Sequence, residues 1–178
     1  MFRRLVPLAA LLLAASPARA QPSSLAPGDV LVVTTDGLFR LPAQGGFATQ
    51  LLPAAAFGGL SSPAIEWVPG TDDALVCTGT QLFRVTFQGT PPAALAPVAL
   101  APTLPGTPLL FDLDLHPGTG ELWVLDRGNG LVHRFDPPHA PGMAPAVSVA
   151  VPKTTRGMCV DARVWPRSLV LAGGTGVS

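Results

Sequence analysis

The chain has 178 residues, of which 48% are hydrophobic and 12% are charged, with 11 basic and 11 acidic side chains. Because the charges balance and there is only one lysine, the composition argues against nucleic acid and anionic membrane surfaces as partners. The 21 prolines and 19 glycines would suit a disordered chain, but the hydrophobic content and a β-type alternation predict a folded domain.

Residues 1–20 have the order of features of a signal peptide. Arg3 and Arg4 form a positive start, and residues 5–15 form an apolar run that is too short to cross a bilayer. Small residues then flank Arg19, which predicts cleavage after Ala20 and a secreted or periplasmic product. The remaining residues, 21–178, form one predicted domain in which no run is long enough for a membrane helix.

The mature chain repeats itself at a period of 44 to 48 residues. Residues 28–40 align with 72–84 at an offset of 44 without a gap, and both segments read as an apolar run, a polar turn and Leu-Phe-Arg. Residues 69–71 align with 117–119, and residues 112–116 with 157–161. Four copies at one period indicate a repeat architecture. The approximate units are 28–60, 61–106, 107–153 and 154–178.

Each unit shows short apolar runs separated by turn residues and no helical period. In the third unit the pattern predicts strands near 110–116, 121–126, 131–136 and 146–151, with Asn129-Gly130 as a strong turn signal. The second run of each unit is apolar on both faces, so one sheet must pack between two others. The sequence therefore predicts an all-β chain, a partial β-propeller of about three and a half four-stranded blades.

Residues 112–137 resemble the NHL and YVTN-type repeats of six- and seven-bladed propellers, which include streptogramin lyases and gluconolactonase-like enzymes. The resemblance rests on Leu113, Leu115, Pro117, Val124, Asp126, Gly128, Asn129 and Phe135. The chain departs from the pattern at His116, Thr78 and Ala172, where the family has aspartate. The resemblance implies propeller blades, and it specifies no chemistry.

The repeats describe an incomplete circle. Residues 21–178 hold about three and a half units, whereas closed propellers have four to eight blades. Residues 21–27 are too short and too rich in proline and serine to give the first unit an innermost strand. We expect the N-terminal part of a longer propeller. The alternative is a complete small protein, either an open array or a β-sandwich.

One predicted innermost strand carries the candidate site. Asp112, Asp114 and His116 alternate along it and so share one face, and Glu66 holds the place of Asp114 in the preceding unit. Together they could hold a divalent metal such as calcium beside the propeller axis. Alternatively, these side chains cap strand ends or bond neighbouring loops.

Other polar residues receive structural interpretations. Cys77 and Cys159 lie 82 positions apart and are predicted to be buried thiols rather than a disulfide. Asp126 is expected to bond the amides of its own turn, and His139 to be solvated. Two recurring sets are also expected to be structural: an arginine that pairs with the neighbouring unit, and a core tryptophan. They comprise Arg40, Arg84 and Arg134, and Trp67, Trp123 and Trp165.

These patterns lead to two functional hypotheses. The first is an exported propeller-repeat protein that acts as a binding scaffold for a protein, peptide or glycan. The alternative is a metal-dependent lyase or lactonase-like enzyme with its site in the axial channel. The sequence shows no spacing typical of a Ser-His-Asp arrangement, a nucleotide loop or a zinc site.

Overall fold

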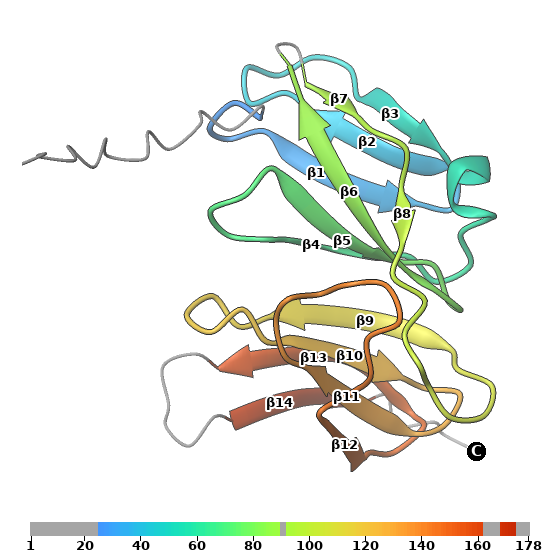
Figure 1. Cartoon of the computed structure of the whole chain (residues 1–178). Helices are drawn as coiled ribbons and strands as arrows, with labels where there is room; N and C mark the ends of the chain where they lie inside the picture. Colours follow the sequence, from blue (N-terminus) through green and yellow to red (C-terminus); the bar gives the residue numbers. More distant parts are fainter. Residues whose placement is uncertain (1–24, 90–91, 162–167, 174–178) are drawn as a thin grey trace, which may run out of the picture.

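The computed structural model describes residues 25–89, 92–161 and 168–173 (Figure 1). Within these ranges the chain folds into four antiparallel sheets, and the only helical segment is one 3-10 turn, η1 (Ala54–Phe57). The prediction of an all-β chain is confirmed. The predicted signal peptide, residues 1–20, lies outside the described residues.

The sheets follow one another along the chain, one in each repeat. The first contains β1 (Val30–Thr34), β2 (Gly37–Leu41) and β3 (Thr49–Pro53). The second contains β4 (Ala64–Trp67), β5 (Asp73–Cys77), β6 (Leu82–Gln88) and β7 (Ala93–Ala94), and β8 (Val98–Ala99) also pairs with β6. The third contains β9 (Leu110–Leu115), β10 (Leu122–Asp126), β11 (Leu131–Phe135) and β12 (Val147–Ala150). The fourth contains β13 (Thr155–Asp161) and β14 (Ser168–Gly173).

In each sheet the strands follow one another as neighbours, except that β8 pairs with β6. In the third sheet the order is β9, β10, β11, β12, so all four predicted strands exist within about one residue of their expected limits. By the sequence alignment, β1 corresponds to β5, and β5 to β10. Both β5 and β10 lie between two strands, whereas β1 pairs with β2 alone among the described residues.

The second sheet is buried on both faces, as the sequence predicted. Leu75 and Cys77 of β5 pack in a core shared with the third sheet. Ala74 and Val76 of the same strand pack in a core shared with the first sheet. All four side chains are fully buried. Burial of this kind on two faces of one short strand makes the second sheet a layer between the first and the third.

The recurring arginines pair with acids of their own sheet. In the third sheet, Arg134 of β11 lies opposite Trp123 of β10, and its Nη1 is 3.7 Å from Oε1 of Glu121, two residues before that tryptophan. The contact is thus a diagonal cross-strand pair. Both partners of this ion pair belong to the third repeat unit, so no residue of a neighbouring sheet takes part in it.

The same diagonal recurs in the first two sheets. Arg84 Nε lies 3.8 Å from Asp73 Oδ2, and Arg40 Nε lies 2.6 Å from Asp29 Oδ2. In each case the acid stands two residues before the residue opposite the arginine. The prediction that these arginines pair with a carboxylate of a neighbouring unit is therefore wrong, because the hairpin register already supplies an acid within reach. Arg84 does reach the neighbouring unit, but there it donates to the backbone carbonyl of His139.

The two cysteines differ in their surroundings. They are not joined to each other: Cys77 is buried in the second sheet, and burial raises the pKa of its thiol to about 12. Cys159 in β13 is exposed, so its predicted burial is wrong. The fourth sheet has only two described strands, and its side chains have fewer neighbours to cover them.

In residues 25–89, 92–161 and 168–173, no helix has the length and the apolar character that crossing a bilayer requires.

Candidate functional site

The predicted site residues come from two adjoining strands. Glu66 lies in β4, Asp112 and Asp114 lie in β9, and His116 follows β9 directly. β9 contacts β4 of the preceding sheet and β13 of the following one. The first strands of three successive sheets therefore lie side by side, and this arrangement brings the three acids together.

Asp112 and Asp114 face β13 and bind its backbone. Asp112 Oδ2 accepts a hydrogen bond from the N–H of Met158 at 2.8 Å, and Asp114 Oδ2 accepts one from the N–H of Val160 at 2.6 Å. Because side chains alternate along a strand, two acids at spacing two meet two amides at spacing two. These carboxylates thus join the third sheet to the fourth. The structural interpretation expected them to cap strand ends or bond neighbouring loops, whereas they bond the backbone of a neighbouring strand.

His116 serves the turn between β9 and β10. Its ring is buried, and Nδ1 accepts hydrogen bonds from the N–H groups of Gly118 at 3.2 Å and Thr119 at 3.1 Å. An imidazole nitrogen that accepts hydrogen bonds from two amide groups has its lone pair in use and is not free to bind a metal. In the part of the chain that the structure describes, no group of three or more His, Cys, Asp or Glu side chains is arranged to hold a metal ion.

The three acids form a half-buried cluster of like charge. Burial, followed by the charges of Asp114 and Asp112, raises the pKa of Glu66 to about 7. Burial also raises the pKa of Asp112, and the charge of Asp114 adds to that effect. Near neutral pH Glu66 therefore retains its proton more readily than an isolated carboxyl group would.

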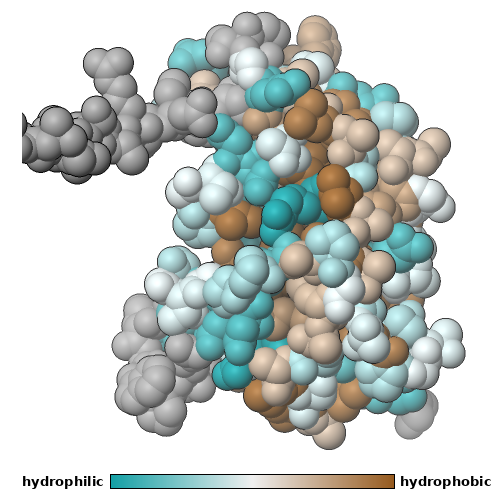
Figure 2. All heavy atoms as spheres, in the orientation of Figure 1, coloured by the Kyte–Doolittle hydropathy of each residue, from teal (hydrophilic) through white to brown (hydrophobic). Residues whose placement is uncertain are grey.

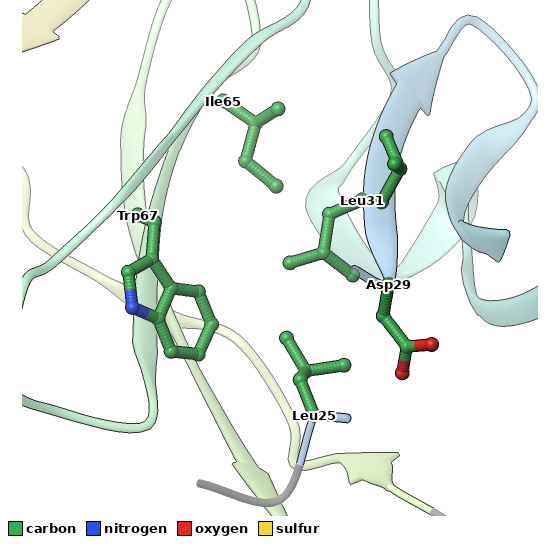
Figure 3. A pocket seen from close by; sticks show the side chains of 6 residues that line it. Leu25, Asp29, Leu31, Ile65 and Trp67 are labelled. Carbon is green, nitrogen blue, oxygen red and sulfur yellow. The ribbon is translucent and has the colours of Figure 1, made fainter. Parts of the chain in front are cut away.

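A hollow of about 380 Å³ lies between β1 and β4, and sequence reasoning missed it. Figure 3 shows Leu25 and Leu31 on one wall and Ile65 and Trp67 on the opposite wall. Asp29 and Val30 complete the lining. The Trp67 ring packs against Phe87 with centroids 5.8 Å apart, so this wall is backed by the second sheet.

The polar member of this lining is fixed in place. Asp29 accepts hydrogen bonds from Arg40 Nε and from the N–H groups of Ala26 and Ala43. The bond from Arg40 is the largest cause of its lowered pKa. Its carboxylate turns away from Trp67 (Figure 3), and the space between the two walls is left to apolar side chains.

The hollow adjoins the edge of β1 that has no partner strand among the described residues. Val30 in that strand is 53% exposed. In the second, third and fourth sheets, the corresponding edge is paired with β4, β9 and β13 respectively. Figure 2 shows apolar atoms at the surface of the upper half of the molecule, which β1 to β8 form.

A buried polar network occupies the third sheet. Asp126 is fully buried and accepts hydrogen bonds from the N–H of Leu109 at 2.9 Å and from Asn129 through both its N–H and Nδ2. Its predicted role in the turn is confirmed. The ring of His133, also fully buried, places Nε2 3.4 Å from Asp126 Oδ2 and Nδ1 2.8 Å from Ser148 Oγ.

The structure tests two further sequence interpretations. His139 is buried rather than solvated, and its carbonyl accepts a hydrogen bond from Arg84. Burial, with the charge of Arg84, lowers the pKa of its ring. The predicted core role of the tryptophans is confirmed for Trp67, which packs against the core between the first and second sheets and also borders the hollow. Trp123 is half-buried in β10, and Trp165 lies outside the described residues.

Comparison with models of known protein families finds no match, and comparison with curated proteins finds none either. The resemblance of residues 112–137 to NHL-type repeats therefore stays a prediction.

Proposed function

We propose that this chain is an exported repeat protein of the β-propeller type that acts as a binding module, and that it takes an extended peptide along the open edge of β1. The observation that carries this proposal is that this edge has no partner strand among the described residues. β1 corresponds to strands that have an inner neighbour in the other sheets, and an apolar hollow lies where its own neighbour would begin.

Three features support a propeller-type arrangement. The innermost strands β4, β9 and β13 contact one another in sequence order. Each sheet then continues outward as a meander, and the second sheet is buried on both faces. Stacked sheets with adjoining first strands are the arrangement that blades around an axis require.

The chemical groups along the edge of β1 indicate which class of ligand can bind there. An unpaired strand edge presents N–H and C=O groups that match another extended backbone. The walls formed by Leu25, Leu31, Ile65 and Trp67 favour apolar side chains. A glycan would need a set of polar groups aimed into the hollow, whereas Asp29 is held by Arg40. Among the three ligand classes considered, a peptide therefore fits best.

Binding of a peptide that copies residues 109–117, the β9 segment, tests the proposal. We expect saturable quenching or enhancement of tryptophan fluorescence that Trp67→Phe removes. Val30→Lys should weaken binding at least about tenfold, because a charged side chain on a strand edge opposes pairing. Val98→Lys is the matched control, since Val98 is also 53% exposed but lies in β8.

The same titration can contradict the proposal. Equal affinity of the wild type and Val30→Lys, or equal loss in both valine variants, would place the peptide elsewhere. A copy of the peptide with N-methyl groups at alternate residues should not bind, because it cannot complete the ladder of backbone hydrogen bonds.

The metal-dependent enzyme remains the alternative, and one observation favours it. Glu66, Asp112 and Asp114 lie close enough for their charges to raise the pKa of Glu66, and calcium takes carboxylate ligands. However, Asp112 and Asp114 each use one oxygen to accept an amide of β13. We therefore expect the same melting temperature in calcium and in EDTA at pH 8. A rise in calcium that Asp114→Ala abolishes would favour the enzyme.

A further inference from the structure

We propose that Ser148 is an activated nucleophile: its hydroxyl hydrogen-bonds His133, Asp126 holds that ring, and the serine can react with esters and related acyl compounds. Ser148 Oγ lies 2.8 Å from His133 Nδ1, and His133 Nε2 lies 3.4 Å from Asp126 Oδ2. These residues are assembled from three neighbouring strands, β12, β11 and β10. The site is independent of the β1 edge, which belongs to another sheet.

The strand register explains why Ser148 and His133 meet. Val151 donates its N–H to the carbonyl of Gly130 at 2.9 Å, so residues 130 and 151 form a hydrogen-bonded pair. In an antiparallel ladder such pairs alternate with pairs that exchange no backbone hydrogen bond, in which the side chains lie closest. His133 and Ser148 are partners in the ladder and fall at such a position. The strand register therefore places the Ser148 hydroxyl next to the His133 ring.

Asp126 affects which ring nitrogen of His133 carries the proton. Burial alone would raise its pKa, but hydrogen bonds from Asn129 and Leu109 and from His133 lower it overall, so the group is a carboxylate at neutral pH. A carboxylate only accepts hydrogen bonds, so Asp126 favours the tautomer of His133 that carries its proton on Nε2. The lone pair of Nδ1 is then directed at the Ser148 hydroxyl, as a general base requires.

Ser148 is accessible, although His133 and Asp126 are fully buried. β12 is the last strand of its sheet in the described structure, so one of its edges is open. At a pair that exchanges no backbone hydrogen bond, the N–H points away from the partner strand. The N–H of Ser148 thus points to the open edge, where it can donate to an oxyanion that forms beside Oγ.

The reaction is an acyl transfer. Ser148 Oγ attacks the carbonyl carbon of the ester, its proton passes to His133 Nδ1, and the C–O bond to the leaving alcohol breaks as that alcohol takes the proton. Water then gives a proton to the same nitrogen and attacks the acyl carbon, the bond from that carbon to Ser148 Oγ breaks, and Oγ takes the proton back as the acid leaves. Ser148 and His133 touch the reacting atoms, and Asp126 positions the ring.

An uncharged alkyl fluorophosphonate probes this chemistry directly in the full-length chain. The Ser148 oxygen forms a bond to phosphorus, the phosphorus–fluorine bond breaks, and fluoride leaves. We expect one adduct per chain, located by peptide mass spectrometry at Ser148. Ser148→Ala should lose the adduct and stay folded, with a lower melting temperature because Nδ1 of the buried His133 loses its hydrogen-bond partner.

Two further variants distinguish activation from simple exposure. Ser61 is exposed as well, but its hydroxyl donates to the carbonyl of Thr78, so Ser61→Ala should leave labelling unchanged. His133→Gln should slow labelling about 100-fold, the usual effect of losing a general base. Failure of the wild type to label at Ser148, preferential labelling at Ser61, or an unchanged rate in a folded His133→Gln variant would each overturn the proposal. If His133→Gln does not fold, the wild-type and Ser148→Ala results decide alone.

Discussion

Replacing Glu66 by glutamine should raise the free energy of unfolding by about 1 to 2 kcal/mol at pH 8 and change it little at pH 4.5. In the folded chain, burial and the charges of Asp114 and Asp112 raise the pKa of Glu66 from 4.5 to about 7. The expected gain allows for solvent screening of a half-buried group. Glutamine has the shape of the protonated acid and carries no charge at any pH.

The direction of the pH dependence follows from the two pKa values. Below pH 4.5, Glu66 is protonated in both the folded and the unfolded chain, so it does not lower the free energy of unfolding. As the pH rises from 4.5 to about 7, the unfolded chain releases the proton that the folded chain retains, so stability falls. Above about pH 7 the loss is constant. Glu66→Gln should therefore flatten the stability profile between pH 4.5 and 8, measured by urea unfolding.

Glu121 is the matched control, because it is the only other glutamate of the chain. It accepts a hydrogen bond from Thr119 Oγ1 at 3.0 Å and faces Arg134. Glu121→Gln removes a paired charge and should lower stability at pH 8. If both variants shift stability in the same direction, the cluster around Glu66 does not have the like-charge character that the structure indicates.

The sequence predicts those features that depend on local pattern. The strands of the third unit follow from apolar runs bounded by turn residues, and burial of β5 on two faces follows from its unbroken apolar run. The proximity of Glu66 and Asp114 follows from their equivalent places in successive repeats. Each of these inferences needs only the spacing of residues along the chain and the period of the repeat.

Features that depend on pairing between strands escape the same reasoning. Arg134 finds Glu121 because the hairpin register places the acid diagonally opposite, which fixes its partner within the sheet. Ser148 meets His133 because the two strands pair across the connection 136–146, whose course the sequence pattern does not fix. The hollow beside β1 depends on how the first two sheets pack. Sequence spacing alone sets none of these three relations.

Asp126→Asn should lower the free energy of unfolding by about 3 kcal/mol at pH 7, measured by urea unfolding. Asn129 Nδ2 and His133 Nε2 both approach Oδ2 of Asp126, at 2.6 and 3.4 Å. If the new amide nitrogen takes that place, it opposes two donors. If it takes the place of Oδ1, it opposes the N–H groups of Leu109 and Asn129. Either orientation leaves buried donors without an acceptor, and the substitution opens no cavity.

Asp136→Asn is the control in the same sheet. Asp136 faces Arg134 Nε at 3.4 Å, but its side chain is 54% exposed, so its loss should cost less than about 1 kcal/mol. The pKa of Asp126 is lowered in the folded chain, so its contribution is fully present above its unfolded value of 3.8 and fades as the pH falls through the folded value. The difference between wild type and Asp126→Asn should therefore shrink in acid. Equal losses in the two asparagine variants at pH 7 would show that the turn does not depend on the buried carboxylate.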